Sequence, residues 1–164
     1  MFLNDVTVDA DGVVYVSDTV TNTIHRWTPG DAPEVVLQDP TMQAPNGLYV
    51  DGRTIVVGSI GSIMPDEIVA PLFTFDLDDG TLTQFGALTA KFDGVEADGD
   101  DLLVTDFRGE LHRVTPDGQS ALLRDFVAAD GLMSSVDFGF DPVRRMVAIP
   151  DFAGGQVAFW TLRE

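Results

Sequence analysis

One pattern recurs four times along the chain and limits its fold more than any other feature. Each copy is an alternating apolar–polar strand, a tight turn of Asp, Gly or Pro, and a second apolar strand. The copies are NDVTVDADGVVYVSD (4–18), NGLYVDGRTIVVGS (46–59), DGVEADGDDLLVTD (93–106) and VDFGFDPVRRMVAIPD (136–151). Gly, Asp and Asn tolerate the positive φ that hairpin turns need. The repeat therefore predicts four antiparallel hairpins.

Further strands are expected after each hairpin. A third strand is predicted at 23–28, 72–77, 110–115 and 156–162, and a short fourth strand at 34–39, 81–86 and 120–126. The polar residues that begin the four units, Asn4, Asn46, Asp93 and Asp137, are 42, 47 and 44 residues apart. A four-stranded unit that recurs at this interval is typical of a β-propeller blade, and no helical periodicity competes with it.

The sequence therefore predicts an all-β fold, a single partial β-propeller domain over residues 1–164. The blades are expected near residues 2–39, 44–86, 91–127 and 134–164. The last unit stops after its third strand, and only Met1 precedes Phe2, so no closing strand is expected for that blade. Exposed sheet edges pair readily with other strands. We therefore expect part of a larger propeller, whose open blade edges could pair with a second copy or a complementing chain.

Composition excludes several classes of protein. The chain has no Cys, which rules out disulfides and thiolate chemistry. Its net charge is −18 and Lys91 is its single lysine, which disfavours a nucleic-acid partner. No apolar run is long enough to span a bilayer and no signal peptide precedes the first strand. We therefore expect a soluble protein with no membrane partner, with a cytoplasmic location slightly favoured.

Polar residues are predicted to gather at one mouth of the propeller channel. The innermost strand of a blade runs along the axis and the second strand returns antiparallel, so the start of one and the end of the other share a face. The resulting pairs are Asn4 with Asp18, Asn46 with Ser59, Asp93 with Asp106, and Asp137 with Asp151. Like charges brought together repel and raise pKa values unless a cation is present. Carboxylate and amide oxygens suit Ca²⁺ or Mg²⁺ better than Zn²⁺.

Two interpretations stay open for these mouth residues. Polar residues that begin an inner strand face the axis, which favours Asn4, Asn46 and Asp93 as metal ligands. The residues that end the second strands fit turn caps as well as pocket residues. The wider set expected around a pocket is Asp18, Ser59, Ile63, Met64, Asp106, Phe107, Asp137 and Asp151.

Four stretches resemble the SMP-30/gluconolactonase/LRE-like family of six-bladed β-propellers. They are FLNDVTVDADGVVYVSD, APNGLYVDG, FDGVEADGDDLLVTD and SSVDFGFDPVRRMVAIPDFAGGQVAF, which together cover most of the chain. The PNGL and DGVEADG segments are the most specific. The resemblance implies a divalent-metal-dependent hydrolase of lactones or related esters. Ca²⁺ is the ion it favours, with Mg²⁺, Mn²⁺ or Zn²⁺ as alternatives.

The resemblance also assigns roles to three residues. Asn4, Asn46 and Asp93 match metal-site positions in three successive blades, and Asp93 also matches the general base that activates water. The family's remaining ligand is a Glu of the first blade, and this chain is expected to begin after about two such blades. Its own glutamates, at 34, 67, 96, 110 and 164, are expected in outer strands, loops or hairpins. Two hypotheses follow: a lactonase or esterase impaired by the absent blades, or a non-catalytic scaffold that assembles through open blade edges.

An insertion and a pair of aromatic residues are further candidates. The segment GSIGSIMPDEIVAP (58–71) separates the second and third strands of its unit on the metal-bearing face. It is interpreted either as a substrate lid carrying Ile60, Ile63 and Met64 or as a loop without a role. Phe107 and Phe152, which follow second-strand Asp residues, fit either a pocket wall or packing between blades.

The remaining polar candidates receive structural interpretations. His25 and His112 occupy the same place in two third strands, which favours a structural surface position over a catalytic base. No G-x-S-x-G motif surrounds any serine. Asp5 is expected at the mouth or in a turn.

Overall fold

The computed structural model describes residues 1–62 and 68–163 and contains four antiparallel sheets. The first comprises β1 (Leu3–Val8), β2 (Val14–Asp18), β3 (Thr23–Trp27) and β4 (Glu34–Gln38). The second comprises β5 (Pro45–Asp51), β6 (Thr54–Ser59), β7 (Ala70–Asp76) and β8 (Leu82–Ala90). The third comprises β9 (Phe92–Asp98), β10 (Asp101–Asp106), β11 (Glu110–Val114) and β12 (Ser120–Asp125), and the fourth comprises β13 (Gly139–Asp141), β14 (Met146–Asp151) and β15 (Gln156–Thr161).

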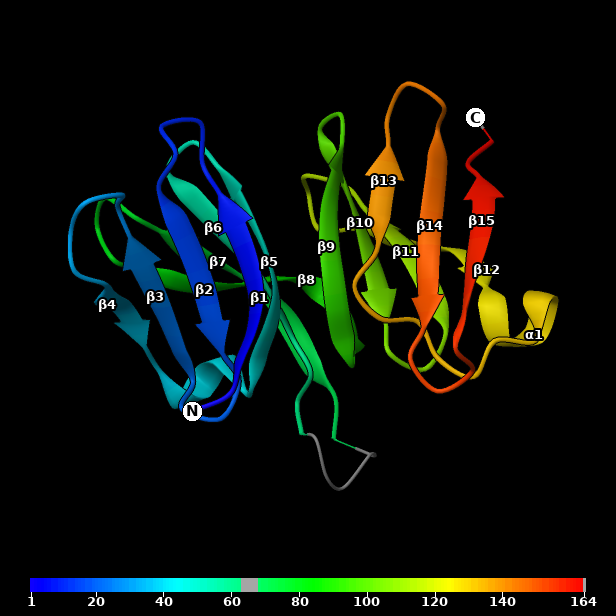
Figure 1. The fold of residues 1–164 in the computed structure, drawn as a ribbon, viewed down its shortest axis with the longest axis horizontal. Coiled ribbons are helices and arrows are strands. Elements are labelled where there is room, and N and C mark those ends of the chain that lie inside the picture. Colours follow the sequence, from blue (N-terminus) through cyan, green and yellow to red (C-terminus); the bar gives the residue numbers. More distant parts are fainter. Residues whose placement is uncertain (63–67, 164) are drawn as a thin grey trace.

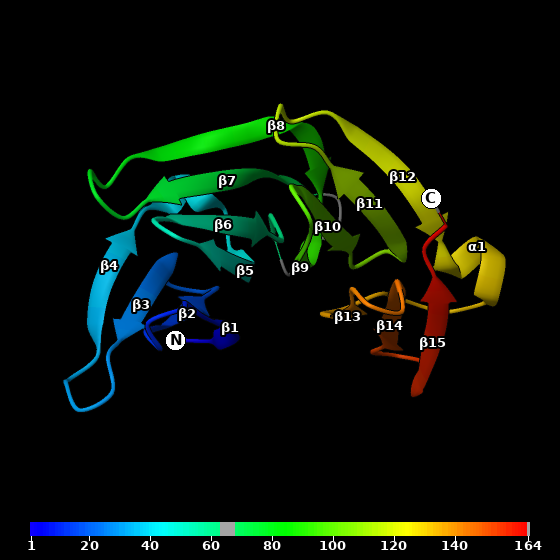
Figure 2. The same ribbon diagram turned by 90° about the horizontal axis from the view of Figure 1, so that it is seen from above.

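The four sheets are the blades of a β-propeller, so the predicted fold class is confirmed (Figure 1). Within each blade the strands lie in chain order, and the fourth blade has three strands. Figure 2 shows β1, β5, β9 and β13 nearest the centre and the later strands of each blade farther out. It also shows that the blades form an arc with one opening, between the first and fourth blades.

Short helical turns fill two connections between blades. A 3-10 turn (Pro40–Met42) joins blade 1 to blade 2, and α1 (Phe126–Asp130) follows β12. Each is preceded by an Asp whose carboxylate caps its first backbone N–H groups. In the described ranges no helix has the length and apolar character needed to cross a bilayer.

The hydrophobic core lies between successive blades, because each sheet is apolar on both faces. We call the face that a blade turns toward the preceding blade its leading face, and the opposite one its trailing face. At the first junction, Tyr15 and Ile24 of blade 1 pack with Leu48, Val57 and Phe73 of blade 2. Similar buried clusters fill the junctions between blades 2 and 3 and between blades 3 and 4. Every blade therefore depends on its neighbours for burial.

Glycine allows the inner strands of neighbouring blades to approach closely at the axis. A Cβ on Gly47 would lie 1.9 Å from the backbone oxygen of Asp93, and one on Gly94 would lie 2.6 Å from the Phe138 ring. Blade contacts at this level also include hydrogen bonds: Ser17 Oγ donates to the Asn46 carbonyl at 2.7 Å. The glycines of the PNGL and FDGV segments are thus explained by packing.

Gly47→Ala should destabilise the protein strongly. The new methyl group would meet a backbone oxygen that can move only if blades 2 and 3 separate, so we expect a loss of about 3 kcal/mol in the free energy of unfolding. Urea denaturation followed by circular dichroism measures it. Gly139→Ala is the control, because a Cβ there meets no atom within 4 Å. Equal stability of the two variants would contradict the packing argument.

Candidate functional site

A cavity of about 360 Å³ lies at the end of the propeller where the inner strands begin. The three predicted metal ligands, Asn4 of β1, Asn46 of β5 and Asp93 of β9, all line it. Asp137, which precedes β13, lines it as well. The structure therefore brings together, from all four blades, the polar residues that begin the repeated units.

The amide groups of Asn4 and Asn46 are held by their nitrogen atoms. Asn4 Nδ2 donates to Thr19 Oγ1 at 3.1 Å, and Asn46 Nδ2 donates to the Phe92 carbonyl at 3.2 Å. Thr19 is fixed in turn, because its hydroxyl donates to the Pro45 carbonyl at 2.8 Å. Within residues 1–62 and 68–163, no hydrogen bond engages either amide oxygen. Both oxygens remain available to a cation or a ligand donor.

Asp93 is a partly buried carboxylate with a raised pKa. Burial raises the pKa of Asp93 to about 6, and the negative charge of Asp137 acts in the same direction. Hydrogen bonds from the Asn46 side chain and the Asp137 backbone oppose the increase. A carboxyl group with this pKa is ionised at neutral pH and is a better proton acceptor than an ordinary Asp.

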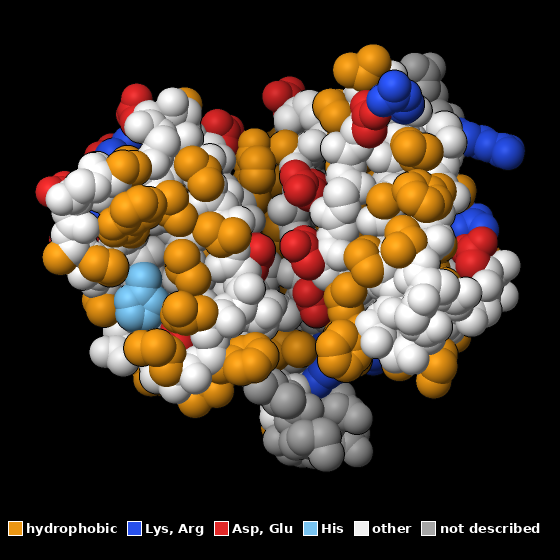
Figure 3. Space-filling view, in the orientation of Figure 1, with side chains coloured by type: hydrophobic (Ala, Val, Ile, Leu, Met, Phe, Trp, Pro, Cys, Tyr) orange, Lys and Arg blue, Asp and Glu red, His pale blue; other side chains and the backbone are white. Residues whose placement is uncertain are grey.

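Further carboxylates interact electrostatically with this site. Burial, followed by the charges of Asp137 and Asp5, raises the pKa of Glu96 to about 6. Figure 3 shows acidic side chains in the hollow between the two halves of the molecule. Glu96 lies in the β9–β10 hairpin, one of the places expected for the glutamates, on its inner strand β9. Glu96 is three positions after Asp93 along β9, roughly 10 Å away, so the two carboxylates do not form a common site for one ion.

Asp5 joins two blades. Its carboxylate accepts hydrogen bonds from the Leu48 backbone N at 2.6 Å and from the Val6 backbone N at 2.7 Å. Burial raises the pKa of Asp5 to about 6, although the bond from Leu48 opposes this effect. Asp5 was expected at the mouth or in a turn, but it lies within β1 and links it to β5.

Lys91 lines the cavity, although it was not among the predicted site residues. Its side chain is buried in the cavity wall, and Nζ donates to the Ser62 carbonyl. The predicted metal ligands at the mouth are acidic and amide groups, whereas the structure adds a lysine ammonium group to them. The available signal was that the single lysine of the chain lies two residues before Asp93.

The residues that end the second strands do not line the cavity. Asp18 accepts hydrogen bonds from the backbone of Phe2 at 2.9 Å and of Thr21 at 3.2 Å. Burial would raise the pKa of Asp18, but these bonds lower it below its ordinary value. Asp106 binds Arg108, and Asp151 accepts bonds from the residue 133 backbone and the residue 134 hydroxyl. These positions fit the turn-cap interpretation.

The equivalent position in blade 2 is Ser59, where the turn is replaced by the insertion. Ser59 Oγ is buried and has no hydrogen-bond partner among the described residues. Ile60, the first residue of the proposed lid, lines the cavity. Ile63 and Met64 fall outside the described residues, so the lid interpretation stays a prediction.

Aromatic side chains supply an apolar wall. Phe107 and Phe152 both line the cavity, with ring centroids 6.3 Å apart. Neither histidine lines it: His25 lies on the leading face of blade 1, and His112 Nε2 is 2.9 Å from Glu110 Oε2. The cavity thus combines amide oxygens, carboxylates and one ammonium group with an apolar side.

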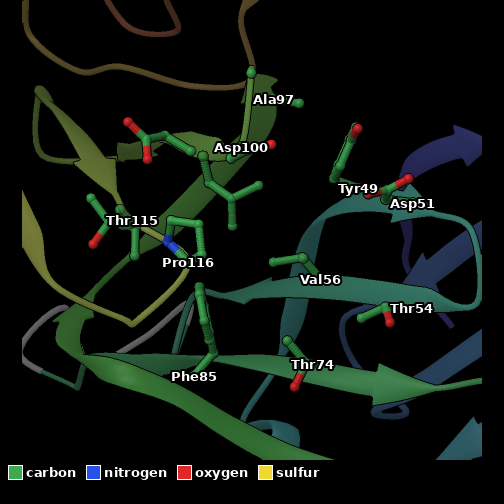
Figure 4. Close-up of a pocket in the computed structure, with 14 residues that line it drawn as sticks. Tyr49, Asp51, Thr54, Val56, Thr74, Phe85, Ala97, Asp100, Thr115 and Pro116 are labelled. Carbon is green, nitrogen blue, oxygen red and sulfur yellow. The ribbon is translucent and has the colours of Figure 1, made fainter.

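A second cavity, of about 550 Å³, lies between blades 2 and 3 near their hairpin turns (Figure 4). Figure 4 shows Tyr49, Asp51 and Thr54 on one side and Asp100 and Pro116 on the other. It lies at the opposite end of the inner strands from the mouth cavity and contains none of the predicted site residues.

Among the described residues, no three His, Cys, Asp or Glu side chains are close enough together to hold a metal ion. A metal site in the mouth cavity would therefore have to use the Asn oxygens. Those oxygens satisfy the requirement, because hard cations accept amide as well as carboxylate ligands.

Comparisons with known proteins show the fold. No family model and no curated protein matches the sequence. Among solved structures, the chain is similar to a virginiamycin B lyase from Staphylococcus aureus, with 15% identity over 99% of this chain and 56% of that chain and a TM-score of 0.67. It is also similar to a gluconolactonase from Xanthomonas campestris, with 18% identity over 91% of this chain and 54% of that chain and a TM-score of 0.69.

A third similar structure is the computationally designed protein Ika4, with 14% identity over 98% of this chain and 91% of that chain and a TM-score of 0.65. The chain thus spans little more than half the length of the lyase and the gluconolactonase, and nearly the whole designed protein. At these identities the likenesses show the β-propeller fold alone.

Glu96→Gln should change how stability depends on pH in metal-free protein. Because the pKa of Glu96 is raised in the folded state, its protonation stabilises the folded state at pH values below the ordinary Glu pKa. This stabilisation is lost as the pH rises through about 6. Between pH 4.5 and about pH 7.5, the free energy of unfolding of the variant should therefore increase by about 1 kcal/mol relative to that of the parent. This value is reduced for solvent screening.

Urea denaturation at the two pH values, with a chelator present, measures this difference. Gln38→Ala on the outer strand β4 is the control, because it removes no ionisable group and should leave the pH profile parallel to that of the parent. A parallel pH profile for parent and Glu96→Gln would contradict the electrostatic interpretation.

Proposed function

We propose that this chain forms the metal-binding part of a propeller hydrolase that acts on lactones or related esters. The observation that carries the proposal is that Asn4, Asn46 and Asp93, from the inner strands of three successive blades, line one cavity. Their oxygens would hold a divalent cation, with Ca²⁺ favoured over Mg²⁺ and Mn²⁺ because the donors are hard and neutral amides contribute. Zn²⁺ is less suited, since the cavity offers no Cys or His.

Each class of residue in the cavity has a role in such a reaction. A bound cation would polarise the substrate carbonyl and stabilise charge on its oxygen. Asp93 would accept a proton from the attacking water, since its raised pKa suits a general base near neutral pH. Lys91 would attract an anionic group of the substrate. Phe107 and Phe152 would contact its hydrocarbon part.

A lyase function is less well supported. One solved complex is described as a catalytically inactive virginiamycin B lyase in which a histidine is replaced by alanine. No histidine is among the residues that line the mouth cavity here. The non-catalytic scaffold remains the alternative if the cavity binds no cation.

Ca²⁺ should stabilise the parent protein in a saturable manner. Binding to the folded state alone at about a hundred times Kd contributes about 2.7 kcal/mol, which corresponds to an increase in Tm of at least about 5 °C. Asp93→Ala and Asn46→Leu should each abolish the increase, because each removes an oxygen ligand. Differential scanning calorimetry with and without Ca²⁺ measures it.

Asp11→Ala, which removes an exposed acid of the β1–β2 turn, is the matched control and should keep the whole increase. The metal site is rejected if the parent shows no increase or if Asp93→Ala shows an equal one.

Lys91→Met should reduce hydrolysis of carboxylate-bearing lactones more than hydrolysis of neutral ones. The loss in kcat/KM should be about tenfold greater for the anionic substrates, since the charged contact is removed. A pH-indicator assay on a panel of paired lactones measures this ratio, with Lys91→Arg expected to restore much of it. An equal loss on both substrate types would show that Lys91 has a structural role only.

A further inference from the structure

Two blade faces on either side of the opening are apolar and exposed. On the leading face of blade 1, Val6 is 58% exposed and Trp27 is 40% exposed. On the trailing face of blade 4, Val157 is 50% exposed and Phe159 is 68% exposed. Figure 3 shows hydrophobic side chains gathered on both halves of the view, over β1–β4 on the left and β13–β15 on the right.

Strand register shows that the leading face of blade 1 corresponds to a face that the preceding blade covers in blade 2. Val6 is paired with Val16, which is paired in turn with His25. The same ladder positions in blade 2 are filled by Leu48, Val57 and Phe73. These three are buried, because they pack against the trailing face of blade 1 through Tyr15 and Ile24. The leading face of blade 1 thus has the positions of a covered face without a blade to cover it.

The trailing face of blade 4 likewise has the residue positions of a covered face, but no blade of this chain covers it. Val157 is paired with Pro150, next to the last residue of β14. The equivalent residue of each of the first three blades is also paired with the residue next to the last one of its second strand. These residues are Ile24, Leu72 and Leu111. All three are 0% exposed, since the following blade covers them. Val157 differs from them in having no following blade in this chain.

We propose that these two faces bind a second copy of the chain, head to tail, so that the trailing face of each copy packs on the leading face of the other. The chain makes this type of contact three times between its own blades, and it carries both halves of a fourth. In contrast, no two leading faces and no two trailing faces pack against each other among the described blades.

Geometry agrees with a closed pair. Both faces border the same opening of the arc, so one partner copy can engage both (Figure 2). Two head-to-tail contacts related by a two-fold axis close into a ring, whereas a single type of open contact would produce a filament. The net charge of −18 opposes association in general, and the one carboxylate of β13 on the trailing face, Asp141, is paired with Arg144.

One variant on each face tests the proposal. Val6→Asp and Phe159→Asp place a charge on exposed positions, so both should fold, which circular dichroism checks. The parent should have the mass of two chains in native mass spectrometry and light scattering. Each variant alone should associate at least about tenfold more weakly, because every contact in its closed pair contains a charge that must be desolvated.

The two variants mixed in equal amounts should form one-to-one pairs. The unaltered trailing face of Val6→Asp can still pack on the unaltered leading face of Phe159→Asp, which restores one contact. Val143→Asp is the matched control: Val143 is 90% exposed in the β13–β14 turn, outside both faces, and this variant should pair like the parent.

Each other outcome overturns the proposal. A monomeric parent would mean that additional blades or a different protein cover the faces. If pairs persist in one variant but not in the other, two copies of the same face pack against each other. Larger polymers would exclude the closed pair. The readout is mass, so failure here is distinguishable from failure of the metal site, which is read from the Ca²⁺ shift.

Discussion

Face-to-face packing of successive blades is the constraint on which the rest of the structure depends. Among the described residues, the three hydrophobic clusters all lie between successive blades. Close packing in turn requires that the inner strands converge. Gly47 and Gly94 permit this, because a Cβ at either position would strike an atom of the next blade. The same requirement leaves apolar faces at the two ends of the arc.

Convergence of the inner strands also creates the electrostatic character of the axis. Asp5, Asp93, Glu96 and Asp137 are all drawn toward the centre, and burial is the largest cause of the raised pKa of each. Groups of like charge in a poorly hydrated space favour a bound cation or bound protons. The proposed metal site and the proposed ring closure are therefore separate consequences of one packing geometry: one concerns the axis, the other the outer faces.

Much of the architecture could be read from local pattern. Alternation and turn residues repeat in every blade, so the fold class and the mouth position of Asn4, Asn46 and Asp93 follow from spacing. Asp5 was misplaced because an alternating strand does not reveal whether a carboxylate faces a turn, a neighbouring backbone N–H or the axis. Lys91 was missed because it lies in a connection between blades, where no periodic pattern indicates direction.

The sequence by itself determined the four-blade repeat and the residue types available to a metal, because a strand's two-residue period and a turn's glycine are local properties. Tertiary structure alone decided which polar groups share the cavity, how burial shifts the pKa of Asp93, and which apolar faces remain uncovered. Those properties depend on residues more than 40 positions apart meeting at the axis, as Leu48 does with Asp5, and local pattern carries no information about such distances.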